Sequence, residues 1–380
     1  MKICYLSEML GPHDYRFLGM LLSRGYETVL VTYRKSMDEA GEEAARHDVR
    51  NLKGLKIIHN AELIDNTPAG FFKRARHFKA LLKKEKPDVL HAGWIQTSGF
   101  LAALSGFHPF LLMPWGTDIT FYSKSCLRNR LVTRYTVRRA DMITCDCNDQ
   151  KDILVDDFKY PSDRVVVIPW AVDRNVFNKG NSDPGLKKRL GLDGKKVLLM
   201  IRIFRPVYAI DDFIRSLPAV RAKNPDTRAL VLGYGPLEKE LKALASSLGL
   251  DDFIIWTGYV PQHEVVKYMN ISDVYVSSSL MDGSSASLLE AMSVGLPVVV
   301  TDIPGNREWV ENGKNGILAG TSNPGSIAEG INRLLDDEQL RRSAGAANER
   351  KIELEADFRK NFGKLEGMYK AMVADQKRAA

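Results

Sequence analysis

Long apolar runs are missing from this chain of 380 residues. No segment approaches the ~20 consecutive apolar residues that a membrane-spanning helix needs, so we expect none. Glu8 stands too early in the chain for the apolar core of a secretory signal. Cysteine is also scarce, since a disulfide framework in a chain of this length needs more than Cys4, Cys126, Cys145 and Cys147. These absences predict a cytoplasmic protein with reduced thiols.

The sequence also lacks the common cofactor and nucleophile motifs. The first apolar segment, residues 2–6, is not followed by Gly-x-Gly-x-x-Gly, which argues against a nicotinamide or flavin dehydrogenase. Walker A, His-Glu-x-x-His and Gly-x-Ser-x-Gly sequences are missing too. Cys145 and Cys147 are too close together for a zinc knuckle. We therefore expect neither a bound cofactor nor a metal site.

Acidic side chains are outnumbered, with 54 Lys and Arg against 47 Asp and Glu and a net charge of +7. Most of the excess lies in residues 1–172, which hold 25 basic and 20 acidic side chains. A basic first half favours an anionic partner such as a phosphate, a lipid headgroup or a nucleic acid. No basic segment is interleaved with aromatic residues, so we expect no nucleic-acid partner.

Short apolar segments alternate with amphipathic helical patterns along the chain. In the first half, we expect strands at residues 2–6, 28–32, 89–92, 110–113, 142–145 and 165–168. In the second half, we expect them at residues 197–201, 229–232, 254–257, 274–277 and 298–301. Strands separated by helices form parallel sheets that are buried on both faces. The pattern predicts an α/β protein with two Rossmann-like, doubly wound domains.

A segment rich in Asn, Asp, Gly and Pro, residues 169–184, has the composition of a linker. It divides the chain into an N-terminal domain of residues 1–172 and a C-terminal domain of residues 173–350. The polar pattern over about 350–375 predicts one long helix in the remaining segment, residues 351–380. Because no strand follows this helix, it could cross between the domains.

The segment after the expected strand at residues 274–277 is the richest in polar groups. Small residues dominate it, so backbone N–H groups could approach a ligand closely; they include Gly283, Ser284, Ser285 and Ser287. A helix begins at about Ser287, and its N-terminal amides and dipole favour a bound diphosphate. Asp282 and Glu290 could accept hydrogen bonds from the paired hydroxyls of a ribose or a hexose.

Simpler interpretations of this segment stay open. Ser287 and Glu290 fit the capping box Ser-x-x-Glu, in which the carboxylate only satisfies a backbone N–H. Asp282 and Gly283 together form a common turn dipeptide.

Two further strand ends carry groups that suit a diphosphate. Arg202 and Arg205 follow the strand at residues 197–201, and arginines there could clamp phosphate oxygens in a bidentate manner. A solvated or ion-paired arginine is the alternative. Gly233 and Gly235 form a short glycine loop after the strand at residues 229–232.

Together these segments resemble the family-4 retaining glycosyltransferases, which have the GT-B fold of two Rossmann-like domains facing a cleft. The resemblance spans nearly the whole chain and is most specific over residues 277–308. Arg202, the glycine loop, residues 258–261 and the hinge at residues 169–173 also stand at family-like places. It implies that the N-terminal domain binds the acceptor and the C-terminal domain binds the nucleotide-sugar donor.

The resemblance also implies roles for single residues. The family's Glu-x7-Glu pair falls on Asp282 and Glu290. By this likeness Glu290 holds the ribose hydroxyls, Asp282 contacts the transferred sugar, and Arg202 stabilises the diphosphate leaving group. The remaining donor-binding candidates are Arg205, Gly233, Gly235, Val260, Gly283, Ser284, Ser285, Ser287 and Leu288.

The chain departs from the family pattern at three places. Asp282 is one methylene shorter than the usual Glu, and Val207 stands where members usually carry a Lys. Trp115 replaces a His that lies near the reacting sugar in many members. An indole cannot act as a base, but it can stack on a sugar, so Trp115 is retained as a catalytic-site candidate.

Candidates for the acceptor side lie in the N-terminal domain. His13 follows the expected strand at residues 2–6, and His91 lies near the end of the expected strand at residues 89–92, so both could face the cleft, although a surface or core histidine is the simpler interpretation of each. Gly11 could let a backbone approach the donor sugar or the acceptor. Asp118 lies in the same segment as Trp115.

Residues 71–86 form a basic helical pattern with seven Lys or Arg and one Glu. Its apolar stripe comprises Phe71, Ala75, Phe78 and Leu82. One interpretation is an amphipathic helix that packs on the core with a solvated basic face. The other is an interfacial anchor on anionic lipid, which would make the protein peripheral on the inner face of a membrane.

The sequence therefore predicts a metal-independent retaining glycosyltransferase in polysaccharide or glycan biosynthesis. It would use a UDP- or GDP-type sugar donor and a glycan or lipid-linked acceptor. Two other classes stay open. Trp115 and Val207 suggest an inactive sugar-nucleotide-binding module of the same fold. The second alternative is a sugar-nucleotide epimerase of the same architecture.

Overall fold

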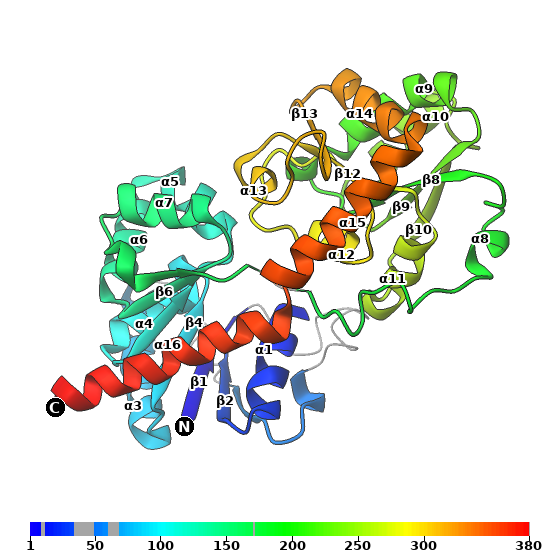
Figure 1. Ribbon diagram of the computed structural model, residues 1–380. Coiled ribbons are helices and arrows are strands. Elements are labelled where there is room, and N and C mark those ends of the chain that lie inside the picture. Colours follow the sequence, from blue (N-terminus) through cyan, green and yellow to red (C-terminus); the bar gives the residue numbers. More distant parts are fainter. Residues whose placement is uncertain (9–11, 34–48, 60–67, 170–171, 380) are drawn as a thin grey trace. The chain divides into compact units, whose positions relative to one another are not determined.

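The computed structural model describes residues 1–8, 12–33, 49–59, 68–169 and 172–379. The chain forms two compact units. Unit 1 comprises Met1–Ile168 together with Phe362–Ala380, and unit 2 comprises Pro169–Asn361. Each unit is built on a parallel sheet with helices between its strands, as Figure 1 shows. This confirms the expected pair of Rossmann-like α/β sheets.

In the described part of unit 1, seven parallel strands lie in the order β3-β2-β1-β4-β5-β6-β7. Their bounds are β1 Lys2–Leu6, β2 Glu27–Thr32, β3 Lys56–His59, β4 Val89–Gly93, β5 Phe110–Met113, β6 Met142–Cys145 and β7 Val165–Val167. The main helices are α1 Pro12–Ser23, α3 Pro68–Glu85, α4 Phe100–Ser105, α6 Leu127–Arg139 and α7 Asn148–Asp156. The sequence analysis missed β3, an edge strand with two half-buried isoleucines between a Lys and a His, and it also missed the edge strand of the other sheet at Gly316–Ala319.

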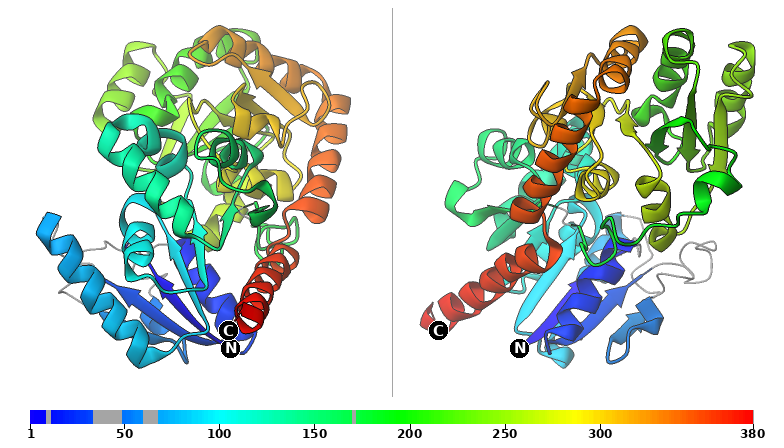
Figure 2. Two further views of the ribbon diagram at one scale, coloured as in Figure 1. Left: turned by 90° about the vertical axis from the view of Figure 1, so that its left-hand side faces the viewer. Right: turned by 45° about the vertical axis from the view of Figure 1, so that its right-hand side comes forward.

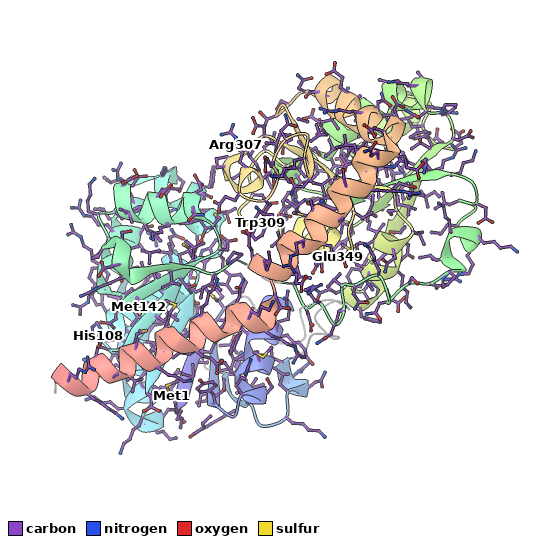
Figure 3. The ribbon with its side chains drawn as sticks, in the orientation of Figure 1. Met1, His108, Met142, Arg307, Trp309 and Glu349 are labelled. Atoms are coloured by element: carbon purple, nitrogen blue, oxygen red, sulfur yellow. The ribbon has the colours of Figure 1, made fainter. Side chains whose placement is uncertain are left out.

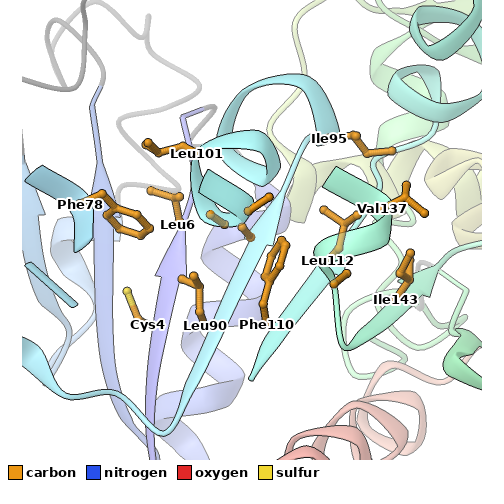
Figure 4. Packing of buried hydrophobic residues seen from close by; sticks show 14 of the residues in the cluster. Cys4, Leu6, Phe78, Leu90, Ile95, Leu101, Phe110, Leu112, Val137 and Ile143 are labelled. Carbon is orange, nitrogen blue, oxygen red and sulfur yellow. The ribbon is translucent and has the colours of Figure 1, made fainter. Parts of the chain in front are cut away.

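The core of unit 1 lies between the sheet and its helices, as Figure 4 shows around β1, β4 and β5. Phe78 of α3 packs there among Leu6, Leu90 and other buried side chains. Ala75 and Leu82, on the same stripe, are buried as well. The predicted stripe of residues 71–86 therefore packs mainly on the core, which is the first of the two interpretations of that helix. Phe72, beside the stripe, is 74% exposed.

Unit 2 contains six described parallel strands in the order β10-β9-β8-β11-β12-β13. Their bounds are β8 Lys196–Ile201, β9 Thr227–Leu232, β10 Ile254–Gly258, β11 Val274–Ser277, β12 Val298–Thr301 and β13 Gly316–Ala319. The helices are α8 Leu186–Arg189, α9 Ile210–Lys223, α10 Glu238–Ser247, α11 Gln262–Asn270, α12 Ala286–Ser293, α13 Pro304–Arg307, α14 Pro324–Asp336 and α15 Glu338–Glu355. The order reverses between β8 and β11, which makes this pair the topological switch point of the sheet.

The single helix expected over about 350–375 is wrong, because α15 and α16 (Phe358–Ala379) are separate helices. Val172 interrupts the helical hydrogen bonding between α15 and α16. The N–H of Val172 donates to the carbonyl of Ala356, and the carbonyl of Val172 accepts from the N–H of Phe358. A helix cannot continue through groups that bond outside it.

Helix α16 begins among the residues of unit 2 and ends in unit 1, where it packs on the sheet (Figure 2). The ring nitrogen Nδ1 of His91 on β4 lies 2.6 Å from the hydroxyl of Tyr369. The carbonyl of His108 accepts a hydrogen bond of 2.7 Å from Gln376 near the end of the helix (Figure 3). No helix in the described ranges has the length and apolar character to cross a bilayer.

Candidate active site

The polar residues of the expected donor site gather at the switch point of unit 2. Arg202 directly follows β8, and Ser277 ends β11. These two strands pair with each other although the 72 residues 202–273 lie between them in the chain. Parallel pairing brings their carboxyl ends to one edge of the sheet, where ligands bind in doubly wound folds.

Arg202 and Asp282 form a largely buried ion pair at this edge. Nη2 of Arg202 lies 2.8 Å from Oδ2 of Asp282, and the two side chains are 9% and 19% exposed. The same nitrogen donates to Oγ of Ser277 at 2.9 Å. The guanidinium also lies 5.0 Å from the ring centre of Tyr208, within cation–π range.

This pair is surrounded by protein rather than by water. Burial raises the pKa of the Asp282 carboxyl above its ordinary value, and the charge of Arg202 opposes that shift. Nε of Arg202 is buried and has no hydrogen-bond acceptor in the described part of the chain. The arginine therefore keeps one donor that an anionic ligand could use.

Helix α12 begins behind this pair, at Ala286, with Ser285 as its N-cap. No side chain caps the helix, so its first amides are not satisfied by a cap. Ser287 lies inside the helix, and its hydroxyl lies 2.9 Å from that of Tyr275. The capping-box interpretation of Ser287 and Glu290 is therefore wrong, because the box requires Ser287 at the N-cap.

Glu290 lies on the second turn of α12 and is only 6% exposed. Its Oε1 accepts a hydrogen bond of 3.1 Å from Nε2 of Gln262, the first residue of α11. Gln262 thus holds the carboxylate from a different helix. It was not among the sequence candidates, although it directly follows the family-like residues 258–261.

The glycine loop lies against the segment that carries the arginines. Gly233 and Gly235 have φ values of 143° and 156°. A methyl group on either would collide with backbone atoms of Arg202 or Phe204, so both positions require glycine. Arg205 lies on the exposed side of the same segment.

The other donor candidates surround these groups. Ser284 is buried, and its Oγ accepts a hydrogen bond of 3.2 Å from Nε1 of Trp309, which Figure 3 labels. Gly283 is half-buried in the turn after Asp282. Val260 and Leu288 pack on the apolar core below the site. Unit 2 therefore assembles arginine, carboxylates, hydroxyls and helix amides from five separate segments.

In unit 1, Trp115 is half-buried in the segment after β5. A methyl group on Gly93, the last residue of β4, would collide with its indole Nε1, so the ring lies against the end of that strand. The N–H of Trp115 donates to Oδ1 of Asp118 at 2.9 Å. The same carboxylate accepts from the N–H groups of Ile95 and Ile119, each at 3.0 Å.

Asp118 is therefore a positioning residue and does not face solvent. It is fully buried, and burial raises the pKa of its carboxyl to about 6, while the three backbone hydrogen bonds oppose that shift. Its carboxylate holds the segment after β4 and the segment of Trp115 in one arrangement.

Replacing Asp118 with Ala should lower the free energy of unfolding by ~3–5 kcal/mol, because three buried N–H groups lose a charged acceptor. Thermal melting of the variant should show a large decrease in Tm. Asp163→Ala, at an exposed position, is the control. Equal melting of the two variants would contradict this structural role.

Of the two histidine candidates, the structure describes the side chain of His91. His91 is fully buried, and its ring packs edge-on against Tyr5 at 4.9 Å. Burial lowers its pKa to about 3, so the ring is neutral, and with Tyr369 it fixes α16 on the sheet. The core interpretation of His91 therefore holds. The side chain of His13 and the whole of Gly11 lie outside the described residues.

Two family models match consecutive parts of the chain. "Glycosyl transferase 4-like" matches residues 2–147, and "Glycosyl transferases group 1" matches residues 183–351. One fits the sheet of unit 1, and the other fits the unit that carries the Arg202–Asp282 pair.

Whole proteins give the same result. The chain is 25% identical over 342 residues to the GDP-mannose-dependent alpha-(1-6)-phosphatidylinositol monomannoside mannosyltransferase of Mycolicibacterium smegmatis, covering 87% of this chain and 86% of that one. It is 25% identical over 263 residues to the N-acetyl-alpha-D-glucosaminyl L-malate synthase of Bacillus anthracis, covering 69% and 68%.

Among solved structures, HepE of Anabaena in complex with UDP superposes with a TM-score of 0.79 at 17% identity, covering 98% of this chain and 100% of that one. This likeness concerns the fold. Together with the two family models and the relatives, it identifies the chain as a family-4-like glycosyltransferase of the GT-B fold.

Proposed function

We propose that this glycosyltransferase takes a nucleoside-diphosphate sugar as donor and transfers the sugar with retention at the anomeric carbon. The buried Arg202–Asp282 pair at the switch point of unit 2 is the observation that carries this proposal. A cation fixed beside a carboxylate can serve a substrate that has an anionic leaving group on one side and sugar hydroxyls on the other.

Each group then has a task in the reaction. The guanidinium of Arg202 and the first amides of α12 stabilise the negative charge that develops on the departing diphosphate. Asp282 accepts hydrogen bonds from hydroxyls of the transferred sugar. Glu290, oriented by Gln262, accepts hydrogen bonds from the ribose.

Donor binding should leave the ion pair intact. In this structure Nη2 of Arg202 contacts both Asp282 and Ser277, whereas the Nε–H of Arg202 has no acceptor among the described residues. A diphosphate oxygen could use that donor without breaking the pair once the atoms that cover Nε move aside. Asp282 would thereby stay charged and oriented toward the sugar.

The ribose contact does not distinguish a uracil from a guanine base, so UDP and GDP sugars are both candidates. The mycolicibacterial relative is named for GDP-mannose, and HepE was solved with UDP-glucose. For the acceptor we propose a glycan or a lipid-linked sugar in polysaccharide assembly, since that relative is named for a phosphatidylinositol mannoside.

A donor panel tests this function. Purified protein is incubated with UDP- and GDP-sugars and a membrane lipid extract, and release of nucleoside diphosphate is measured. The anomeric proton coupling of the product, read by NMR, reports the stereochemistry. We expect turnover with one donor class and an anomeric configuration equal to that of the donor. An inverted product would refute retention, and no release with any donor would count against the donor assignment.

We also propose that the reaction needs no metal ion, because Arg202 and the amides of α12 supply positive charge at the diphosphate. Nucleotide affinity, measured by calorimetry, should be the same in EDTA and in Mg²⁺. A complete loss of binding in EDTA would contradict this proposal.

Finally, we propose that the basic face of residues 71–86 attracts the protein to an anionic membrane from the cytoplasmic side. Lys79, Lys83 and Lys84 on this face are exposed, while the apolar stripe below them is largely buried. The contribution of this face is therefore electrostatic and should weaken with salt.

A further inference from the structure

A second surface of unit 1 combines exposed apolar and basic side chains. The apolar ones are Phe121, Tyr122, Leu127, Leu131 and Tyr135, exposed by 52%, 42%, 73%, 58% and 40%. The basic ones are Arg128, Arg130, Arg134, Arg138 and Arg139, which are all exposed. We call these ten residues the α6 face, since eight of them lie on α6.

The spacing of these residues places most of them on one side of the helix. Leu127, Leu131 and Tyr135 are four residues apart, so they form a single row, and Arg134 and Arg138 lie beside it. The opposite side of α6 carries the buried residues Thr133, Thr136 and Val137, which pack inward. The exposed row is therefore not the side that holds the helix in the fold.

Aromatic contacts extend the surface on both sides. Phe121 and Tyr122 lie in the short π-helix η4 (Asp118–Tyr122), which α5 (Ser123–Ser125) separates from α6, and their ring centres are 5.3 Å apart. The ring of Tyr135 lies 5.8 Å from that of Phe100 on α4. Between α3, α4 and α6 lies a groove of about 320 Å³, whose lining includes Phe72 and Arg128.

The charge of this surface has one sign. Residues 119–140 contain five arginines and one lysine but no aspartate or glutamate. Lys124 pairs with Asp157 at 2.9 Å. None of the five arginines has an ion-pair partner in the described part of the chain, and none shares its helix with an acid. The face thus offers uncompensated positive charge around protruding leucines and aromatic rings.

We propose that the α6 face docks on the surface of an anionic phospholipid bilayer, with Leu127 and Leu131 inserted between the headgroups. Arginines that flank exposed aliphatic and aromatic side chains match both layers of such an interface: the phosphates bind the guanidinium groups, and the upper acyl region takes the apolar groups. This docking does not depend on the proposed donor chemistry.

Cys126 provides a labelling site beside the α6 face. Cys126 immediately precedes α6 and is exposed, whereas Cys4, Cys145 and Cys147 are buried. An environment-sensitive fluorophore on Cys126 should therefore report contact of this face with lipid. The full chain is mixed with phosphatidylcholine vesicles with or without phosphatidylglycerol, and binding is measured by co-sedimentation and by the emission of the label.

We expect binding to the anionic vesicles with a blue shift of the label, and little binding to neutral ones. Leu127→Ser with Leu131→Ser should weaken binding at least about ten-fold, since two large apolar groups no longer insert. Neutralising Arg128, Arg130 and Arg134 to Gln should weaken it about a hundred-fold at low salt. Leu248→Ser with Leu354→Ser, two exposed leucines of unit 2, is the matched control and should bind like wild type.

Three outcomes would overturn the proposal. The first is failure of wild type to bind anionic vesicles. The second is binding without a spectral shift at Cys126. The third is equal binding by the Leu127/Leu131 variant and the control. That result would mean that the exposed leucines do not insert into lipid, and it would favour a protein as the partner of this face. Reversal of Lys79, Lys83 and Lys84 to Glu should weaken binding while leaving the blue shift of the bound fraction intact.

Discussion

Arg202→Gln should lower turnover by about 10²–10³-fold, the usual effect of removing one preorganised donor from a developing negative charge. The loss has a second cause in this protein. Burial raises the pKa of the Asp282 carboxyl, and Arg202 is the charge that opposes this shift. Without the arginine, Asp282 should therefore take up a proton more readily and bind the sugar hydroxyls less well.

Arg205→Gln is the matched control, because Arg205 lies three residues further on and is exposed. It should change turnover by less than about three-fold, as expected of a solvated side chain. The double variant Arg202→Gln with Asp282→Asn should be little slower than Arg202→Gln alone, because the two residues act as a unit. Normal turnover of Arg202→Gln with an unchanged Tm would contradict the leaving-group role.

Glu290→Gln should weaken UDP or GDP binding about ten- to a hundred-fold, because one charge-assisted hydrogen bond worth ~1.5–3 kcal/mol is lost. Asp282→Asn should instead lower turnover more than nucleotide affinity, because Asp282 is assigned to the transferred sugar. Calorimetry with nucleoside diphosphates and initial rates with the donor separate these two effects.

Glu264→Gln provides the same chemical change at a half-buried carboxylate of α11, which pairs with Lys267 at 2.7 Å. It should leave binding and turnover unchanged. Helix α12 has no side-chain cap, so Glu290 does not stabilise it by capping. Glu290→Gln should therefore not lower the Tm through the loss of a cap. Wild-type nucleotide affinity in Glu290→Gln, together with normal turnover in Asp282→Asn, would refute the donor-site assignment.

Much of the fold was predictable from the sequence, because buried parallel strands are short apolar segments bounded by polar residues. Strands β1, β5, β6, β11 and β12 have the predicted bounds. The meeting of Arg202 and Asp282 followed from the same pattern, since polar groups after β8 and β11 must lie at one edge of a parallel sheet.

Other features depend on contacts between distant residues and left no local signal. The break between α15 and α16 is made by Val172, far away in the chain. His91 is buried where α16 packs on β4, and the hydroxyl of Tyr369 on α16 is hydrogen-bonded to its ring nitrogen. The pattern Ser-x-x-Glu at Ser287 looked like a helix start, but α12 begins one residue earlier, so Ser287 bonds Tyr275 instead.

The central claim is that the carboxyl ends of β8 and β11 bind a nucleoside-diphosphate sugar, and a thermal-shift panel tests it most directly. A ligand at a thousand times its Kd should stabilise the folded protein by ~4 kcal/mol, which is a clear rise in Tm. We predict that at least one UDP- or GDP-sugar raises the Tm of wild type and raises that of the Arg202→Gln/Glu290→Gln double variant far less. If no nucleotide sugar stabilises wild type, or if the double variant is stabilised equally, the claim is wrong.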